Sequence, residues 1–273
     1  MKPSIVVLTD FFAVTNRALS YAAGLAVPLK ASLLLLHARH DELLAPEEFV
    51  SRHTAEGELK TGYALEKLAA DQPVATAVDI SDFSLAEAVR EVVGQRPPLV
   101  VVLGRAGAAS NSHDLVTDVA MDLLRHTPYP LLVIPPAGWD AFPPRHLLLA
   151  VDGEPFSLVE YRDVLSQLLL ATHGTLNLVQ VNDNGETAPS AAAVLDTVRT
   201  NDLVNELAEG SLRQVYQNTV VGGVLQEAAE QQADMLVIIA RRHSLIGGMF
   251  HRSVTAQLLR ESAIPVLVLP AAE

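Results

Sequence analysis

The sequence predicts an α/β protein made of two doubly wound, parallel five-stranded sheets. The strongest support is an internal repeat: a buried strand, a polar loop, a helix and a second strand follow one another at 97–135 and again at 233–270. Pro130 opens the last strand of the first copy, and Pro265 opens that of the second. Self-similarity at a fixed spacing indicates duplication of a whole structural unit.

Apolar runs of strand length alternate with helical segments in both halves. Strands are predicted at Ser4–Thr9, Ser32–Ala38, Val74–Ile80, 97–104 and 129–135, and again at His146–Val151, Leu176–Val181, Leu212–Thr219, 233–240 and 264–270. Apolar runs without polar alternation are typical of a parallel sheet covered on both faces. Strands that alternate with helices at this spacing indicate βαβ units with right-handed crossovers.

Helical periodicity predicts the helices between these strands. They are expected at 15–28, Glu58–Ala70, Ser84–Val93, 116–127, from Ser157 onward, at 193–209, at 222–231 and at 255–263. Ser84 and Glu87 have the spacing of a capping box, in which each side chain accepts a hydrogen bond from the backbone of the other residue.

A proline-rich segment separates the two halves. Four prolines fall within the ten residues 135–144, a density that neither a helix nor an inner strand tolerates. We therefore predict a first domain at 1–136, a linker at 137–144 and a second domain at 145–273. The single tryptophan, Trp139, lies in the linker and is expected to pack against one of the domains.

Composition excludes several classes of function. The chain has 19 basic and 32 acidic residues, a net charge of −13, which disfavours nucleic acid as a ligand. The absence of cysteine excludes disulfides, thiolate catalysis and cysteine-bound zinc, and fits a reducing compartment. No apolar run approaches the roughly 18 residues of a membrane helix. We expect a cytoplasmic protein that binds neither membrane nor nucleic acid.

The order and spacing of these segments resemble the universal stress protein family in its tandem two-domain form. The resemblance covers essentially the whole chain and rests on LTDF at 8–11, LLLLHA at 33–38, GRAG at 104–107 and SVTAQLLRESAIPVLVLP at 253–270. It implies the adenine-nucleotide α-hydrolase-like sheet with strand order 3-2-1-4-5, and a ligand position at the switch point between strands 1 and 4. It also implies two domains packed face to face, with the last strands, 130–134 and 265–269, at their contact.

Members of this family that bind ATP carry G-x-x-G, nine further residues, and then glycine followed by serine or threonine. Glycines let backbone N–H groups approach phosphate, and the helix N-terminus completes the site. In the first domain Gly104 and Gly107 fit, and the spacing then reaches Thr117 and Asp118. A side chain replaces the third glycine and a carboxylate replaces the hydroxyl, so this site is predicted to repel phosphate. A magnesium ion bridged by Asp118 is the alternative.

In the second domain Ala240 and His243 align with the two glycines, the loop is one residue shorter, and Arg252 and Ser253 align with the final pair. The loop is basic, with cationic residues at Arg241, Arg242, His243, His251 and Arg252. One interpretation is an anion or phosphate site formed by arginine side chains and the amides of Ser253 and Val254. The other is a basic loop paired with acidic residues of the first domain.

Residues at strand ends complete the candidate site. In nucleotide-binding relatives, a carboxylate matching Asp10 and Asp152 lies beside the nucleoside; loop hydrogen bonding or helix capping is the alternative role. Ala38 and Val181 end the second strand of each domain and are included as candidate contacts.

No catalytic or metal-binding residue is predicted. His37 and His40 have H-x-x-H spacing, but one ends a strand and the other lies in the loop beyond it. The resemblance implies a stress-associated, non-catalytic regulatory or binding protein with degenerate nucleotide sites. The alternatives are an ATP- or ADP-binding protein with slow, metal-assisted hydrolysis, and a structural partner-binding module. No cofactor is assigned; ATP or another phosphate-bearing anion is the candidate ligand. The expected partners are the two domains themselves and an unidentified protein, and a homodimer stays open.

Overall fold

The computed structural model describes residues 2–9, 13–39, 55–105, 113–137, 142–158, 161–182, 190–201, 203, 207–241 and 253–271. The elements of the first half are β1 (Ser4–Leu8), α1 (Ala13–Leu29), β2 (Ser32–Ala38), α2 (Ala55–Ala70), β3 (Thr76–Ser81), α3 (Leu85–Gln95), β4 (Val100–Gly104), α4 (His113–His126) and β5 (Leu131–Ile134). Those of the second half are β6 (His146–Val151), α5 (Arg162–Thr172), β7 (Thr175–Asn182), α6 (Ala191–Thr200), β8 (Leu207–Tyr216), α7 (Val220–Glu230), β9 (Met235–Arg241), α9 (Val254–Glu261) and β10 (Val266–Ala271).

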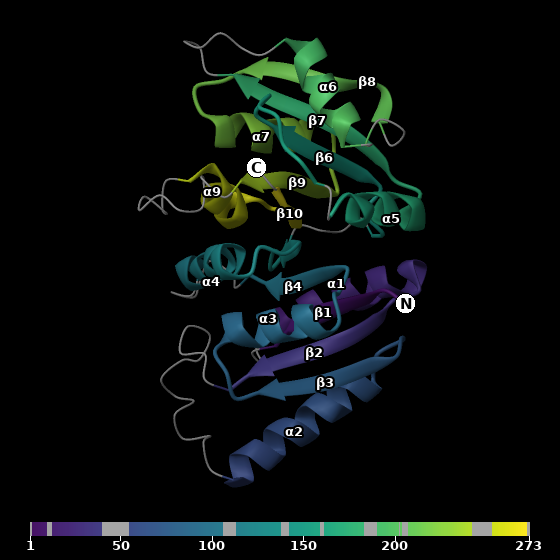
Figure 1. The fold of residues 1–273 in the computed structure, drawn as a ribbon, viewed down its shortest axis with the longest axis vertical. Helices are drawn as coiled ribbons and strands as arrows, with labels where there is room; N and C mark the ends of the chain where they lie inside the picture. The colour runs from purple at the N-terminus through teal and green to yellow at the C-terminus, as the bar shows by residue number, and fades with distance from the viewer. Residues whose placement is uncertain are drawn as a thin grey trace.

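The strands form one 10-stranded sheet in the order β3-β2-β1-β4-β5-β10-β9-β6-β7-β8. Within each half all neighbouring strands are parallel, and the order is 3-2-1-4-5. The predicted fold class is therefore confirmed as two doubly wound five-stranded sheets. In Figure 1 the first half lies at the bottom and the second half at the top, so the sheet runs along the long axis.

Helices cover both faces of this sheet. Side chains of a strand alternate between faces, so Ile5 and Val7 pack in one core while Val6 and Leu8 pack in the other. Helices α1, α2, α5 and α6 line the first core, and α3, α4, α7 and α9 line the second. Because both faces are buried, the inner strands are apolar throughout, which is the pattern seen in the sequence.

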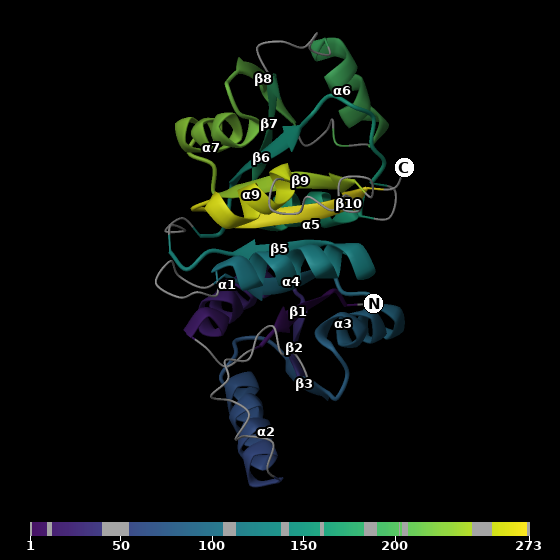
Figure 2. The same cartoon turned by 90° about the vertical axis from the view of Figure 1, so that its left-hand side faces the viewer.

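The two halves meet edge to edge, not face to face as predicted. Strands β5 and β10 pair antiparallel, with Leu132 opposite Leu267, and lie side by side in Figure 2. Leu132 and Leu267 occupy equivalent places in the two halves, so the strand pairing is locally twofold. The physical reason is the open edge: the last strand of each half would otherwise leave its outer N–H and C=O groups unpaired. Helices α4 and α9 then pack across the junction on one face, and α1 and α5 on the other.

Helix boundaries differ from the prediction where side chains from distant segments intervene. The Ser84 capping box is confirmed. However, α5 begins at Arg162 and not at Ser157, because the preceding segment is held by Asn201: Leu158 N donates to Asn201 Oδ1 (2.6 Å), and Asn201 Nδ2 donates to the carbonyl of Phe156 (2.9 Å). The helix predicted at 193–209 ends at Thr200, because residues from Leu207 onward pair with β7 as strand β8.

The described part of the proline-rich segment lies along α1. Arg17 Nη1 donates to the carbonyl of Pro136. The ring of Phe142 packs edge-on against Tyr21, with centroids 5.2 Å apart. Gly24 makes this possible, because a Cβ at that position would lie 2.4 Å from the Phe142 ring. Trp139 lies outside the described residues.

Tyr129 and Tyr161 form a second contact across the junction. Their rings are 5.4 Å apart in an edge-on arrangement, and Tyr161 donates its hydroxyl to the carbonyl of Pro128 (2.9 Å). Tyr129 donates its hydroxyl to the carbonyl of Pro98. Burial, and to a lesser degree the neighbouring Tyr161, raises the pKa of Tyr129 to about 12.

Because of this contact, we expect the folded protein to lose stability at alkaline pH. Because the pKa of Tyr129 is higher in the folded protein than its ordinary value near 10, the unfolded chain loses this proton first. The stabilisation is complete below about pH 10 and is lost as pH rises towards 12. Burial also raises the pKa of Tyr21, which acts in the same direction. Urea midpoints at pH 9, 10 and 11 should fall less steeply for Tyr129→Phe than for the wild type. Identical slopes would contradict this assignment.

Candidate functional site

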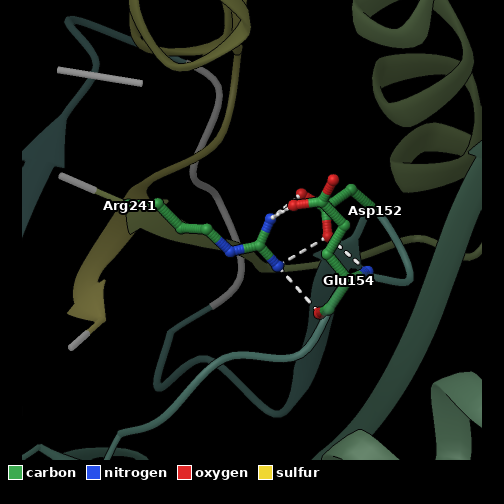
Figure 3. A network of polar contacts seen from close by, with 3 residues as sticks. All are labelled: Asp152, Glu154 and Arg241. Carbon is green, nitrogen blue, oxygen red and sulfur yellow. Dashed lines mark hydrogen bonds and ion pairs between the residues drawn. The ribbon is translucent and has the colours of Figure 1, made fainter. Parts of the chain in front are cut away.

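The switch point of the second half is occupied by an arginine and two carboxylates from the same half (Figure 3). Arg241 ends β9, and Asp152 and Glu154 follow β6 directly. Nη1 donates to Asp152 Oδ2 (2.5 Å) and Glu154 Oε2 (2.8 Å), while Nη2 donates to Asp152 Oδ1 (2.8 Å) and the carbonyl of Glu154 (2.8 Å). We call these three residues the Arg241 cluster.

A tight turn aims both carboxylates at the one guanidinium. Gly153 has a φ of 86°, a conformation that favours glycine, and Glu154 N donates to Asp152 Oδ1 (3.0 Å). The Arg241 side chain is only 11% exposed, whereas the carboxylates of Asp152 and Glu154 are 62% and 67% exposed. The cluster carries a formal charge of −1, so it presents carboxylates to solvent and not the guanidinium.

This arrangement bears on both interpretations of the basic loop. Arg241 was one candidate phosphate ligand, and the alternative paired the loop with acidic residues of the first domain. The carboxylates on Arg241 come instead from its own half, because the β6–α5 connection leaves the sheet beside β9. Arg242, His243, His251 and Arg252 lie outside the described residues.

The strand register corrects the alignment of the two glycine loops. Gly104 pairs with Ile134 on β5, and Ile239 pairs with Leu269 on β10. Since Ile134 and Leu269 are equivalent, the residue matching Gly104 is Ile239 and not Ala240. From this position to Thr117 or Arg252 the spacing is then 13 residues in both halves, so the predicted one-residue deletion is wrong. A branched side chain stands where the first half has its first glycine.

Arg105, which follows Gly104 at the end of β4, extends into the second half. Nη1 donates to the carbonyls of Leu259 (2.6 Å) and Arg260 (2.7 Å), and Nη2 donates to the carbonyl of Ser262 (2.6 Å). These are carbonyls at the C-terminal end of α9, where a cation is favourable. Arg105 is 6% exposed, and burial lowers the pKa of its guanidinium from the ordinary value. Arg105 occupies an unspecified position of the G-x-x-G pattern, and no local sequence pattern predicts its contact with α9.

The first-half motif does not lie at a helix N-terminus. Helix α4 begins at His113, so Thr117 and Asp118 are its fifth and sixth residues. Only the first four N–H groups of a helix are left for a ligand. Thr117 is buried and Asp118 half-buried. The helix predicted from 116 begins three residues earlier, at His113. Thr117 and Asp118 therefore lie inside the helix and not at its N-terminus.

In the second half the equivalent position does begin a helix. Ser253 is the N-cap of α9, and its hydroxyl accepts from Ala256 N (3.0 Å). Its Oγ is therefore engaged in capping. Val254 is the first residue of α9, and its N–H is among those without an internal helical acceptor.

The remaining candidates lie at strand ends. Ala38 ends β2 and is half-buried, beside His37, whose Nδ1 lies 3.0 Å from the carbonyl oxygen of Thr9. Val181 on β7 packs closely on α7: a Cβ at Gly223 would lie 2.7 Å from its Cγ1. Asp10, Gly107 and His40 lie outside the described residues. Among those that are described, no group of three or more histidine and acidic residues could hold a metal ion.

Comparison with known proteins agrees with this architecture, a doubly wound α/β protein with two switch points in one chain. The model of the universal stress protein family matches residues 1–135 and again 144–270. The chain therefore belongs to the universal stress protein family and carries two tandem domains, as the sequence predicted.

Solved structures share the fold over nearly the whole chain. A universal stress protein from Archaeoglobus fulgidus DSM 4304 is 15% identical with a TM-score of 0.68, covering 100% of this chain and 98% of its own. A functionally unknown protein from Pseudomonas aeruginosa PAO1 is 18% identical with a TM-score of 0.64, covering 98% and 92%. A putative universal stress protein from Pseudomonas aeruginosa UCBPP-PA14 is 17% identical with a TM-score of 0.61, covering 98% and 93%. At these identities the likeness shows the fold alone.

None of the curated proteins matches the chain. Among the described residues, no helix combines the length and apolar character needed to cross a membrane.

Proposed function

We propose that this protein is a non-catalytic regulatory or binding member of the universal stress protein family whose switch points do not hold ATP. The observation that carries the proposal is the Arg241 cluster. Both Nη atoms of Arg241 already donate to Asp152 and Glu154, at distances of 2.5–2.8 Å. A phosphate would have to displace two carboxylates from the guanidinium or approach a cluster of net charge −1.

The first half supports the same conclusion by a different route. A phosphate cradle needs free N–H groups, and those of Thr117 and Asp118 lie within α4. The Asp118 carboxylate adds a negative charge where the family motif has a hydroxyl. On this basis neither switch point is a nucleotide site, and a protein partner is the remaining candidate ligand. We further propose, from the absence of cysteine, that the protein acts in a reducing, cytoplasmic setting.

Calorimetry with ATP, ADP and AMP, each with and without Mg²⁺, tests the proposal. No binding at micromolar affinity is expected in any of the six titrations. Micromolar binding that needs Mg²⁺ and disappears in Asp118→Ala would instead support the nucleotide-binding alternative. Micromolar binding without Mg²⁺ would contradict the proposal directly.

A gain-of-binding variant tests the role of the Arg241 cluster. Asp152→Asn with Glu154→Gln removes both charges that face Arg241, so affinity for pyrophosphate should rise by about tenfold or more. Asp71→Asn with Asp79→Asn is the matched control, because both carboxylates are exposed and lie in the first half. If the two double variants bind pyrophosphate equally, overall charge and not the Arg241 cluster limits binding.

A further inference from the structure

Helix α9 is held at its two ends by different halves of the molecule. At its N-terminus Ser253 caps it from within the second half, at the candidate site of that half. At its C-terminus Arg105 reaches three carbonyls from the first half, directly after the glycine that opens the candidate site there. An eight-residue helix is about 12 Å long, so a single short element joins the two contacts. Figure 1 shows α9 against α4 at the middle of the molecule.

The contact has no counterpart on the other side of the junction. The register places Ala240 at the position of Arg105, and a methyl group cannot donate a hydrogen bond to the end of α4. In the described part of the chain, therefore, the first half reaches α9 through Arg105, whereas Ala240 of the second half makes no equivalent hydrogen bond to α4.

We propose that Arg105 couples the two switch points through α9. The backbone of Arg105 belongs to the first sheet, since its N–H donates to the carbonyl of Ile134 (2.7 Å). Its guanidinium makes bonds of 2.6–2.7 Å, and a shift of about 1 Å at either end would weaken all three. A structural change at Gly104, where β4 ends, then alters the stability of the α9 N-terminus at Ser253. By thermodynamic reciprocity, a change at Ser253 alters the stability of the strand end at Gly104.

This coupling is a property of the fold and does not depend on which ligand, if any, either switch point binds. It makes Arg105 a positioning residue. The coupling predicts that the effects of two substitutions are not additive. A substitution at the N-terminus of α9 should affect the first half only while the Arg105 guanidinium is present.

Native-state hydrogen exchange tests the coupling without a ligand. Ser253→Ala removes the cap of α9 and should speed exchange within α9 by about fivefold. In the wild-type background it should also speed exchange of the residue-105 amide, which bonds to Ile134, by about twofold or more. In an Arg105→Met background the same Ser253→Ala change should leave that amide unaltered, and Arg105→Lys should restore part of the response.

Ser190→Ala is the matched control, because Ser190 caps α6 in the second half in the same way. Its hydroxyl accepts a hydrogen bond from Ala193 N (3.3 Å). It should not alter the residue-105 amide in either background. If Ser190→Ala and Ser253→Ala affect that amide equally, the exchange follows general opening and the proposal fails. It also fails if Ser253→Ala acts equally with and without Arg105.

Discussion

Replacing Arg105 with alanine is expected to lower the free energy of unfolding by about 3 kcal/mol. The guanidinium is 6% exposed and donates three hydrogen bonds, so its removal leaves carbonyls of the last turn of α9 without their donor. Leaving a buried acceptor unpaired costs about 1–3 kcal/mol, and a cation at a partly buried helix C-terminus contributes up to about 2 kcal/mol. Because relaxation and water recover part of these costs, the net loss is smaller than their sum. Urea unfolding followed by circular dichroism measures it.

Two variants show whether this loss comes from the geometry or from the charge. Arg90→Ala removes an exposed arginine from α3 and should change stability by no more than about 0.5 kcal/mol. Arg105→Lys keeps the charge but lacks the planar guanidinium with its several N–H donors. Compared with Arg105→Ala, it should therefore recover less than half of the lost stability. Full recovery by lysine would mean that the helix end needs only a positive charge. A loss as small as that of Arg90→Ala would mean that the contact does not hold the halves together.

The strands of this protein are predictable from sequence because burial on both faces leaves a strong signal. Runs such as Leu33–Leu36 or 235–239 have no other plausible structure in a duplicated βαβ pattern. Their register is a different matter. The run from Met235 to Ala240 is apolar throughout, so sliding it by one residue changes nothing in the pattern, and only its pairing with β10 identifies Ile239 as the match for Gly104.

The candidate site could be placed but not characterised. The fold predicts a ligand position at the carboxyl ends of the strands, where Asp152 lies, whereas Arg241 is a candidate because it belongs to the basic loop. That they bind each other could not be predicted, because 89 residues separate them and the side chains need the turn at Gly153. The contact of Arg105 cannot be predicted for the same reason, since its acceptors lie 154–157 residues away.

Truncating the two leucines at the centre of the junction should have an effect as large as that of Arg105→Ala. Leu132 and Leu267 are each 2% exposed, face one another across β5 and β10, and line a small apolar cavity between α1 and α5. Replacing a buried leucine with alanine costs about 2–5 kcal/mol, rising with the size of the void that remains. Because each leucine lies on a strand paired on both sides, the site can collapse little, so we expect about 3–4 kcal/mol for each single variant, measured by urea unfolding.

The double variant shows whether the junction joins the halves energetically. Because the two leucines are in adjacent strands and share one cavity, their effects should fall short of additivity by about 0.5–2 kcal/mol. The paired edge joins the two halves into one sheet, so weakening the core beneath it should let the double variant unfold in two separate transitions. Val27→Ala, at a 53% exposed position on α1, is the control and should leave one transition at nearly the wild-type midpoint. Strict additivity with a single transition would show that each half stabilises its last strand alone, and that β5–β10 pairing follows from folding without contributing to it.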